Sequence, residues 1–153
     1  MAESAADAAN VLNLERFLPY RLSLLSNTVS RAIAKIYADR FGLTIAEWRV
    51  VAVVARYDRP TQNDVGLRTA MDKVRVSRSV SALVRRGLVR RRADTADRRR
   101  QTLELSPRGW SVYRAVAPLA VAHETKLLQA LAAEDRLLLD RLLATLQSAA
   151  EGL

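Results

Sequence analysis

The chain has 153 residues, of which 50% are hydrophobic, and its formal net charge is +9. This length suits one domain, or a compact domain with an oligomerisation element. No stretch approaches the roughly 20 apolar residues of a membrane span. The absence of cysteine excludes disulfides and thiol-based redox sensing. The first ten residues lack the positive and apolar regions of a signal peptide, so we expect a cytoplasmic protein with a short N-terminal tail.

The whole net charge lies in residues 73–108. Twelve of the 25 Lys and Arg residues fall in this window with only three acidic residues, and the rest of the chain sums to zero. The self-repulsion of such a window is relieved by an anionic polymer, so nucleic acid is the expected partner. A solvated charged face is the alternative. The arginines are interleaved with apolar residues at structured spacing, which favours nucleic acid.

In chain order, a long helix is expected over residues 14–41, because apolar residues recur at three- and four-residue steps. Pro19 belongs in its first turn or marks a kink after a short leading turn, and Gly42 ends it. The segment Thr44–Glu47 has the form of a capping box and begins a second helix, which extends to about Tyr57.

Two further helices follow Pro60. Thr61, with Asp64 three residues later, begins a short helix that ends near Ala70. Asp72 is expected to cap a helix over residues 73–86, which Gly87 ends. One face of this helix is apolar and should be buried, and the opposite face mixes arginines with small residues, as suits an element pressed into a DNA groove. The expected buried residues are Val76, Val80, Leu83 and Val84.

The segments 88–92 and 101–105 flank a polar, arginine-rich stretch, and we expect a β-hairpin. Ser106 and Pro107 then cap and begin a helix to about Leu131, which Pro118 can bend. The last helix begins with two acidic residues and ends near Ala150. Its leucines form a stripe too wide for one contact, so we expect it to be buried by a second copy of the chain. The alternative is packing on the rest of the same chain. These leucines are Leu137, Leu138, Leu139, Leu142, Leu143 and Leu146.

Two short helices followed by a basic hairpin describe a winged helix-turn-helix, and several local sequences resemble the multiple antibiotic resistance regulator (MarR) family. The most specific match is the hairpin. The family pattern has Asp, any residue, Arg, five residues, Leu-Thr and then Gly; here Asp97-Arg98-Arg99 is followed after five residues by Leu105-Ser106-Pro107-Arg108-Gly109. Ser106 replaces the usual Thr, and both cap a helix with a hydroxyl. The segments 43–50 and 72–89 also look like the family.

The resemblance implies a mainly α fold with a small β-hairpin wing, in which N- and C-terminal dimerisation helices flank the winged helix-turn-helix. It divides the chain into residues 1–43 (tail and dimerisation helix), 44–106 (DNA-binding module) and 107–153 (C-terminal dimerisation helices). It also implies a homodimer whose recognition helices enter successive major grooves, while each wing reaches the flanking minor groove. By carry-over, Arg99 is the minor-groove residue and Asp97 orients it, although ordinary turn chemistry also explains Asp97.

The resemblance makes the helix over residues 73–86 the recognition helix, which supplies contacts to base edges and nearby phosphates. The start of the short helix binds phosphate through backbone N–H groups, and the wing tip supplies arginines. Other arginines, Arg86 among them, are expected to give a non-specific phosphate field. The DNA-binding candidates are Thr61, Gln62, Val74, Arg75, Ser77, Arg78, Ser81, Arg85, Arg92, Asp97, Arg98, Arg99 and Arg100.

An enzyme is not expected. The sequence has no cysteine and one histidine, which excludes a Cys nucleophile and a His-rich metal site. No glycine-rich phosphate loop is present, and no cofactor is predicted. The expected function is a ligand-responsive transcription regulator, a repressor that binds a palindromic operator. The alternatives are a non-specific architectural DNA-binding protein and a module whose arginines face an acidic protein.

Members of the family often release DNA when they bind a small aromatic acid, phenol or acyl thioester between the dimer domain and the winged module. Arginines near the dimer domain and the winged module could bind the carboxylate of such a ligand, and aromatic residues could line an apolar pocket for it. The alternative is that the aromatic residues are core and the arginines are paired on the surface; the histidine is otherwise structural. The effector-binding candidates are Arg16, Arg21, Trp48, Arg49, Trp110, Tyr113 and His123.

Overall fold

The structure is a computed structural model and describes residues 12–93 and 100–152. The described residues form six helices and one two-stranded antiparallel sheet, which confirms the predicted fold class. In chain order these elements are α2 (Leu18–Phe41), α3 (Ile45–Arg56), α4 (Gln62–Thr69), α5 (Lys73–Arg85), β1 (Val89–Ala93), β2 (Gln101–Leu105), α6 (Pro107–Leu128) and α7 (Ala133–Glu151).

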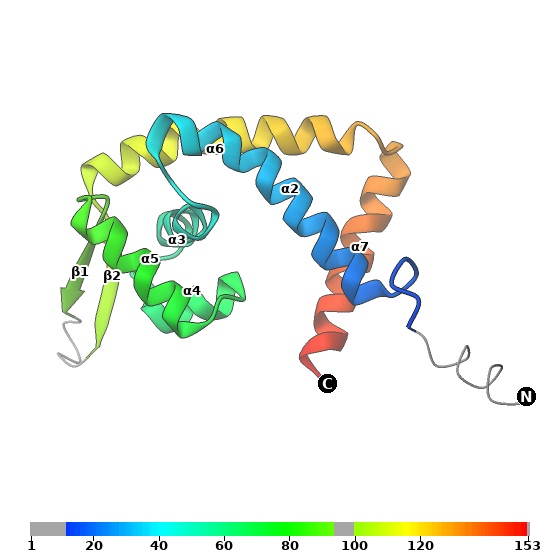
Figure 1. Ribbon diagram of the computed structural model, residues 1–153, viewed down its shortest axis with the longest axis horizontal. Coiled ribbons are helices and arrows are strands. Elements are labelled where there is room, and N and C mark those ends of the chain that lie inside the picture. Colours follow the sequence, from blue (N-terminus) through cyan, green and yellow to red (C-terminus); the bar gives the residue numbers. More distant parts are fainter. Residues whose placement is uncertain (1–11, 94–99, 153) are drawn as a thin grey trace, which may run out of the picture.

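The elements form an arch (Figure 1). Helices α2 and α6 lie in contact along its span, and α3, α4, α5 and the hairpin gather at one end. Helix α7 descends at the other end. None of the helices in the described ranges is long and apolar enough to cross a membrane.

Helix α2 begins four residues later than predicted. Leu18 is its first residue and Pro19 lies in its first turn, where a missing N–H costs nothing. The residues before it form a separate turn, in which the N–H of Arg16 donates to the side-chain oxygen of Asn13 at 3.0 Å. The end is as predicted, because Gly42 takes the left-handed conformation with φ 61°.

Local signals also placed the starts of α3 and α6. In the predicted capping box of α3, the Glu47 N–H donates to Thr44 Oγ1 at 3.1 Å and the Thr44 N–H to Glu47 Oε2 at 2.8 Å. Ser106 caps α6. Helix α6 ends at Leu128 rather than Leu131, because the chain turns there and the Leu131 N–H bonds to the Leu128 carbonyl at 3.0 Å.

One hydrophobic core fills the winged end of the arch, and it draws on all three predicted segments of the chain. Val50 and Val51 of α3 and Val80 of α5 are fully buried there. Tyr37 of α2 and Val116 of α6 are buried in the same cluster. The winged module is therefore fixed to α2 and α6 by packing, and not only by the chain connections.

Candidate nucleic-acid interface

Helix α4 starts with a capping box that fixes the geometry of its N-terminus. The Asp64 N–H donates to Thr61 Oγ1 at 3.1 Å, and the Thr61 N–H and hydroxyl donate to Asp64 Oδ2 at 2.8 and 2.7 Å. These hydrogen bonds from Thr61 hold the pKa of Asp64 below its ordinary value, with a smaller contribution from Arg100. The predicted phosphate-binding pair therefore lies at a helix N-terminus, with Gln62 as its first residue.

Helix α5 presents a cationic face to solvent. Asp72 caps it, and its carboxylate accepts the Arg75 N–H at 2.8 Å. The residues of α5 predicted for DNA contact lie on this side: Val74, Arg75, Ser77, Arg78 and Arg85 are exposed, as is Lys73, and Ser81 is partly exposed.

The opposite face of α5 packs in the core. Val76, Val80 and Leu83 are buried, as predicted, whereas Val84 is only half-buried. Ser79 is buried in its place, which the apolar pattern did not indicate. A small hydroxyl-bearing side chain carries no periodic hydrophobic signal, so this residue was missed.

The hairpin lies beside α5 and contacts the helix-turn-helix through both of its strands. Val89 pairs with Leu105, and Ala93 pairs with Gln101. The Arg91 guanidinium donates to Ser81 Oγ at 3.1 Å, which joins β1 to α5.

The other strand is joined to α4. The Leu103 N–H donates to the carbonyl of Pro60 at 2.8 Å, and Thr61 forms a bridge with Thr102. Arg100 lies 3.8 Å from the Asp64 carboxylate. The wing and the α4 N-terminus therefore form one unit.

Arg92 and Glu104 form an ion pair across the hairpin, with Nε and Oε1 2.7 Å apart. Of the predicted wing-tip residues, Asp97, Arg98 and Arg99 lie outside the described residues, so their role stays a prediction. Two pairs link separate elements, Arg91 with Ser81 and Arg100 with Asp64. No motif in the sequence indicated these contacts.

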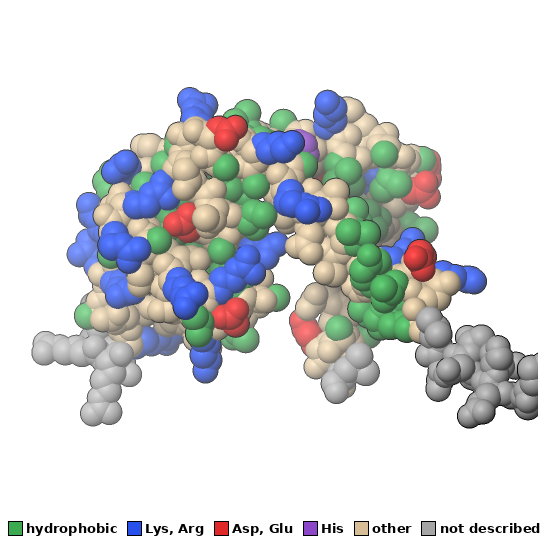
Figure 2. Space-filling view, viewed as in Figure 1, with side chains coloured by type: hydrophobic (Ala, Val, Ile, Leu, Met, Phe, Trp, Pro, Cys, Tyr) green, Lys and Arg blue, Asp and Glu red, His purple; other side chains and the backbone are tan. Residues whose placement is uncertain are grey.

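The basic residues gather on one part of the molecule. Figure 2 shows Lys and Arg side chains clustered over the winged end, while apolar side chains are prominent toward the opposite end. Within residues 73–108, most of the arginines that the structure describes are exposed. Those of α5 and β1 lie on elements that contact each other. Exposed arginines on a helix and an adjoining hairpin make a continuous cationic surface.

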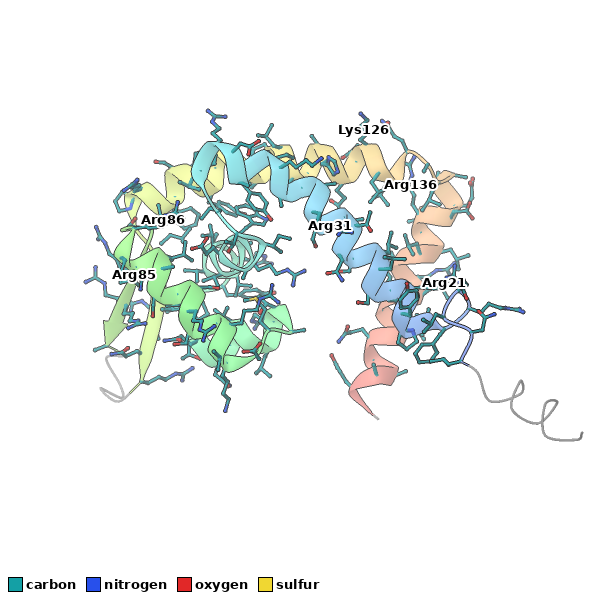
Figure 3. All side chains as sticks on the ribbon, viewed as in Figure 1. Arg21, Arg31, Arg85, Arg86, Lys126 and Arg136 are labelled. Carbon is teal, nitrogen blue, oxygen red and sulfur yellow. The ribbon has the colours of Figure 1, made fainter. Side chains whose placement is uncertain are left out.

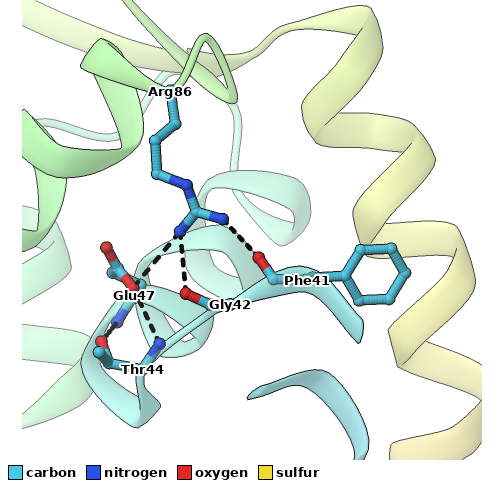
Figure 4. Close-up of polar contacts among 5 residues, drawn as sticks. All are labelled: Phe41, Gly42, Thr44, Glu47 and Arg86. Atoms are coloured by element: carbon cyan, nitrogen blue, oxygen red, sulfur yellow. Dashed lines mark hydrogen bonds and ion pairs between the residues drawn. The ribbon is translucent and has the colours of Figure 1, made fainter. Parts of the chain in front are cut away.

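Arg86 is a correction to the predicted phosphate field. Its guanidinium points away from the exposed α5 face, toward the C-terminal end of α2 (Figure 4). It donates to the Gly42 carbonyl at 3.1 Å and to the Phe41 carbonyl, and it lies 3.7 Å from the Glu47 carboxylate. Because the Arg86 guanidinium binds helix-end carbonyls and a buried carboxylate, it stabilises the fold and is not available to bind phosphate.

The aromatic candidates for effector binding lie together. The ring centroids of Trp48 and Tyr113 are 6.0 Å apart, and those of Trp110 and Tyr113 are 5.7 Å apart. Tyr37, whose pKa burial raises, stacks on Trp48 with a centroid distance of 5.6 Å. All these rings pack against or within the core cluster, so the core alternative accounts for their position.

The polar candidates are dispersed. Arg49 faces α2, where it donates to Ser30 Oγ at 3.4 Å. Arg16 and Arg21 are exposed, and Arg21 lies toward the end of α2 far from α3 and α5 (Figure 3). His123 is half-buried on α6. A single chain therefore brings Arg49 near the aromatic cluster and leaves Arg16 and Arg21 apart from it.

Residues 41–100 match the family model described as the MarR family. The structure is similar to a MarR/EmrR family transcriptional regulator from Acinetobacter sp. ADP1, with 22% identity, a TM-score of 0.85, and coverage of 93% of this chain and 100% of that one. It is similar to MepR of S. aureus, solved as a MepR-DNA complex (20% identity, TM-score 0.78, 89% and 98% coverage).

A third similar structure is BpsR of Bordetella bronchiseptica, described in terms of regulation of DNA binding by 6-hydroxynicotinic acid (21% identity, TM-score 0.77, 90% and 98% coverage). No curated protein matches the chain.

Proposed function

We propose that the chain, whose residues 41–100 match the MarR family model, is a sequence-specific DNA-binding transcription regulator of that family. The observation that carries the proposal is the exposed face of α5. Arg75 and Arg78 project from it beside small residues, next to a hairpin lined with arginines. Arginines of this kind bind guanine edges or phosphates in a major groove. The similar fold of MepR, solved with DNA, supports this placement.

The protein acts as a homodimer. Every described residue of α7 is exposed in the single chain, and Leu137, the most exposed of its leucines, is 71% exposed. Leu24 and Leu25 on α2 are exposed as well. Monomeric proteins seldom leave so many large apolar side chains in water, so a partner surface is the better account. A symmetric dimer presents two recognition helices, which suits a palindromic operator with half-sites one helical turn apart.

The regulator is a repressor that a small aromatic acid, phenolic compound or acyl thioester releases from DNA. BpsR, whose DNA binding is regulated by 6-hydroxynicotinic acid, supports this class of effector. Trp48 and Tyr113 supply an aromatic wall, and Arg49 supplies a cation where α3 meets α2. A ligand here lowers DNA affinity only if it prefers the dimer geometry that does not bind DNA.

The DNA proposal is tested by footprinting the purified protein on the DNA upstream of its own gene. We expect protection of a palindrome, with each half-site in one helical turn. Uniform coating of the fragment would favour the architectural alternative. If the protein binds no duplex but captures an acidic polypeptide, the arginines serve a protein interface.

The effector proposal is tested separately, on the protein–DNA complex. Benzoate- and cinnamate-type acids and their thioesters are titrated against it, with release of DNA and the melting temperature of the protein as readouts. An Arg49→Gln variant should keep its DNA affinity and lose the response to carboxylates. If no compound releases DNA or raises the melting temperature, the aromatic effector is wrong and the DNA proposal stands.

A further inference from the structure

The end of α5 is fastened to both helices that lead away from the winged module. Arg86 is the C-cap residue of α5, and its side chain reaches the last carbonyls of α2, at Phe41 and Gly42 (Figure 4). The backbone carbonyl of Arg86 also accepts a hydrogen bond from Arg108 of α6 at 3.2 Å. One residue therefore contacts α2 through its side chain and α6 through its main chain.

The electrostatic environment holds the Arg86 guanidinium in this place. The C-terminal end of α2 carries the partial negative charge of its unpaired carbonyls, which favours a cation there. Glu47 lies beneath it, with its side chain 10% exposed, and the Arg86 side chain is 35% exposed. The same Glu47 oxygen accepts the Thr44 N–H in the α3 capping box, so α2, α3 and α5 share one polar cluster.

Near Arg86, the backbone at the start of α6 lies close to the backbone that follows α5. Ser106 Oγ donates to the Gly87 carbonyl at 2.6 Å, and the Ser106 N–H donates to the Leu88 carbonyl at 3.0 Å. A Cβ placed on Gly109 would lie 2.0 Å from the Leu88 carbonyl oxygen. The start of α6 is thus pressed against the chain that leaves α5. A guanidinium with several donors in a fixed plane suits such a joint better than an ammonium.

We propose that Arg86 is a positioning residue that sets the orientation of the recognition helix α5 on α2, and thereby the distance between the two recognition helices of the dimer. The inference rests on the proposed function, since it needs a DNA-binding dimer. In such a dimer α2 belongs to the scaffold and α5 meets the DNA. A change in the angle between them moves the two recognition helices relative to each other.

The test is the dependence of DNA affinity on half-site spacing. The duplex that the wild-type protein selects from a random library is prepared with its own spacing and with one base pair inserted or deleted at the centre. One inserted base pair rotates one half-site by about 35° about the duplex axis. We expect the wild type to prefer its own spacing, and Arg86→Gln to lose most of this preference. Its affinity for the selected duplex should fall by about tenfold, as for a lost charge-assisted hydrogen bond.

Two variants control for charge and for folding. Arg85→Gln removes the same charge from an adjacent, exposed position, and it should lower affinity by one factor at every spacing. Glu47→Gln removes the ion pair, while Gln still completes the capping box. It should weaken the spacing preference in the same sense as Arg86→Gln, which keeps the test valid if Arg86→Gln does not fold. Arg86→Lys should restore part of the preference.

The outcomes are separable. If no duplex is selected, the proposed function fails. Circular dichroism first establishes that Arg86→Gln and Glu47→Gln are folded. If the wild type prefers one spacing and both folded variants keep that preference unchanged, Arg86 does not position α5. The DNA-binding proposal would then still stand.

Discussion

Arg100 lies 3.8 Å from the carboxylate of Asp64, so the residue just before β2 meets the N3 residue of the α4 capping box. Asp64 also accepts two hydrogen bonds from Thr61, and these lower its pKa. One carboxylate therefore stabilises the helix start and tethers the wing, which relates the acid stability of the protein to the proposed DNA-binding surface.

We predict that Asp64→Asn removes a part of the pH dependence of stability. Because the folded state holds the Asp64 pKa below its ordinary value, its contribution is complete above the unfolded pKa of about 3.9 and is lost as the pH falls through the lower folded pKa. The difference in urea midpoint between wild type and Asp64→Asn should thus be larger near pH 7 than near about pH 3. An equal difference at both pH values would contradict this account.

Gly109→Ala should destabilise the protein, because the added methyl group would meet the Leu88 carbonyl oxygen at 2.0 Å. We expect the free energy of unfolding to fall by about 1–3 kcal/mol, as is typical when a well-packed site is overfilled. The matched control is Gly152→Ala, where the nearest atom, the Ala149 carbonyl oxygen, is 3.6 Å away. Denaturant unfolding of both variants checks the prediction, and it fails if they are equally stable.

Arg78 and Arg90 should contribute to DNA binding in different ways. Arg78 lies on the exposed face of α5, so Arg78→Ala should cost about 1–3 kcal/mol of discrimination between selected and scrambled duplexes. Arg90 lies exposed on β1, and Arg90→Ala should weaken binding to both duplexes alike and lower the salt slope by about 1. Titrations at several salt concentrations separate these effects. Identical losses of discrimination would show that α5 is not the recognition helix.

The exposed leucines of α7 should be buried in the dimer. Leu142 is 50% exposed in the single chain, and Leu142→Glu should place a charge in the apolar interface and shift the protein toward monomer. Ser148→Glu adds the same charge about 120° from Leu142 and about 160° from Leu146 around the helix axis, and it should leave the dimer intact. Sedimentation velocity at micromolar concentration distinguishes them. A wild-type protein that sediments as a monomer would overturn the dimer itself.

The local signals in the sequence were sufficient for most of the fold. Capping residues such as Thr44, Thr61 and Ser106 make hydrogen bonds within three residues, so their effect is written in the adjacent sequence. The hairpin was equally predictable, because residues 101–105 alternate polar and apolar side chains after an arginine-rich stretch. Charge placement along the chain likewise indicated which helix carries an exposed cationic face.

The sequence did not indicate contacts between distant residues. Arg86 looked like one more member of a basic run, yet its partners at Phe41 and Gly42 lie 45 and 44 residues away. The pairing of Arg91 with Ser81 was missed for the same reason. For the effector candidates, the sequence grouped Arg21 with Trp48, whereas α2 is long enough to hold them apart. Tertiary geometry decides which members of a charged cluster are free to bind.

Sequence-specific binding to DNA by the cationic surface is tested most directly by the affinity for operator and scrambled duplexes across salt concentration. The concentration of +9 in one quarter of the chain should release many counterions, so log affinity should fall steeply with log salt for both duplexes. At each salt concentration the operator should bind at least about 10³-fold more tightly. Equal affinities for the two duplexes at every salt concentration would contradict the claim and leave a non-specific DNA-binding protein.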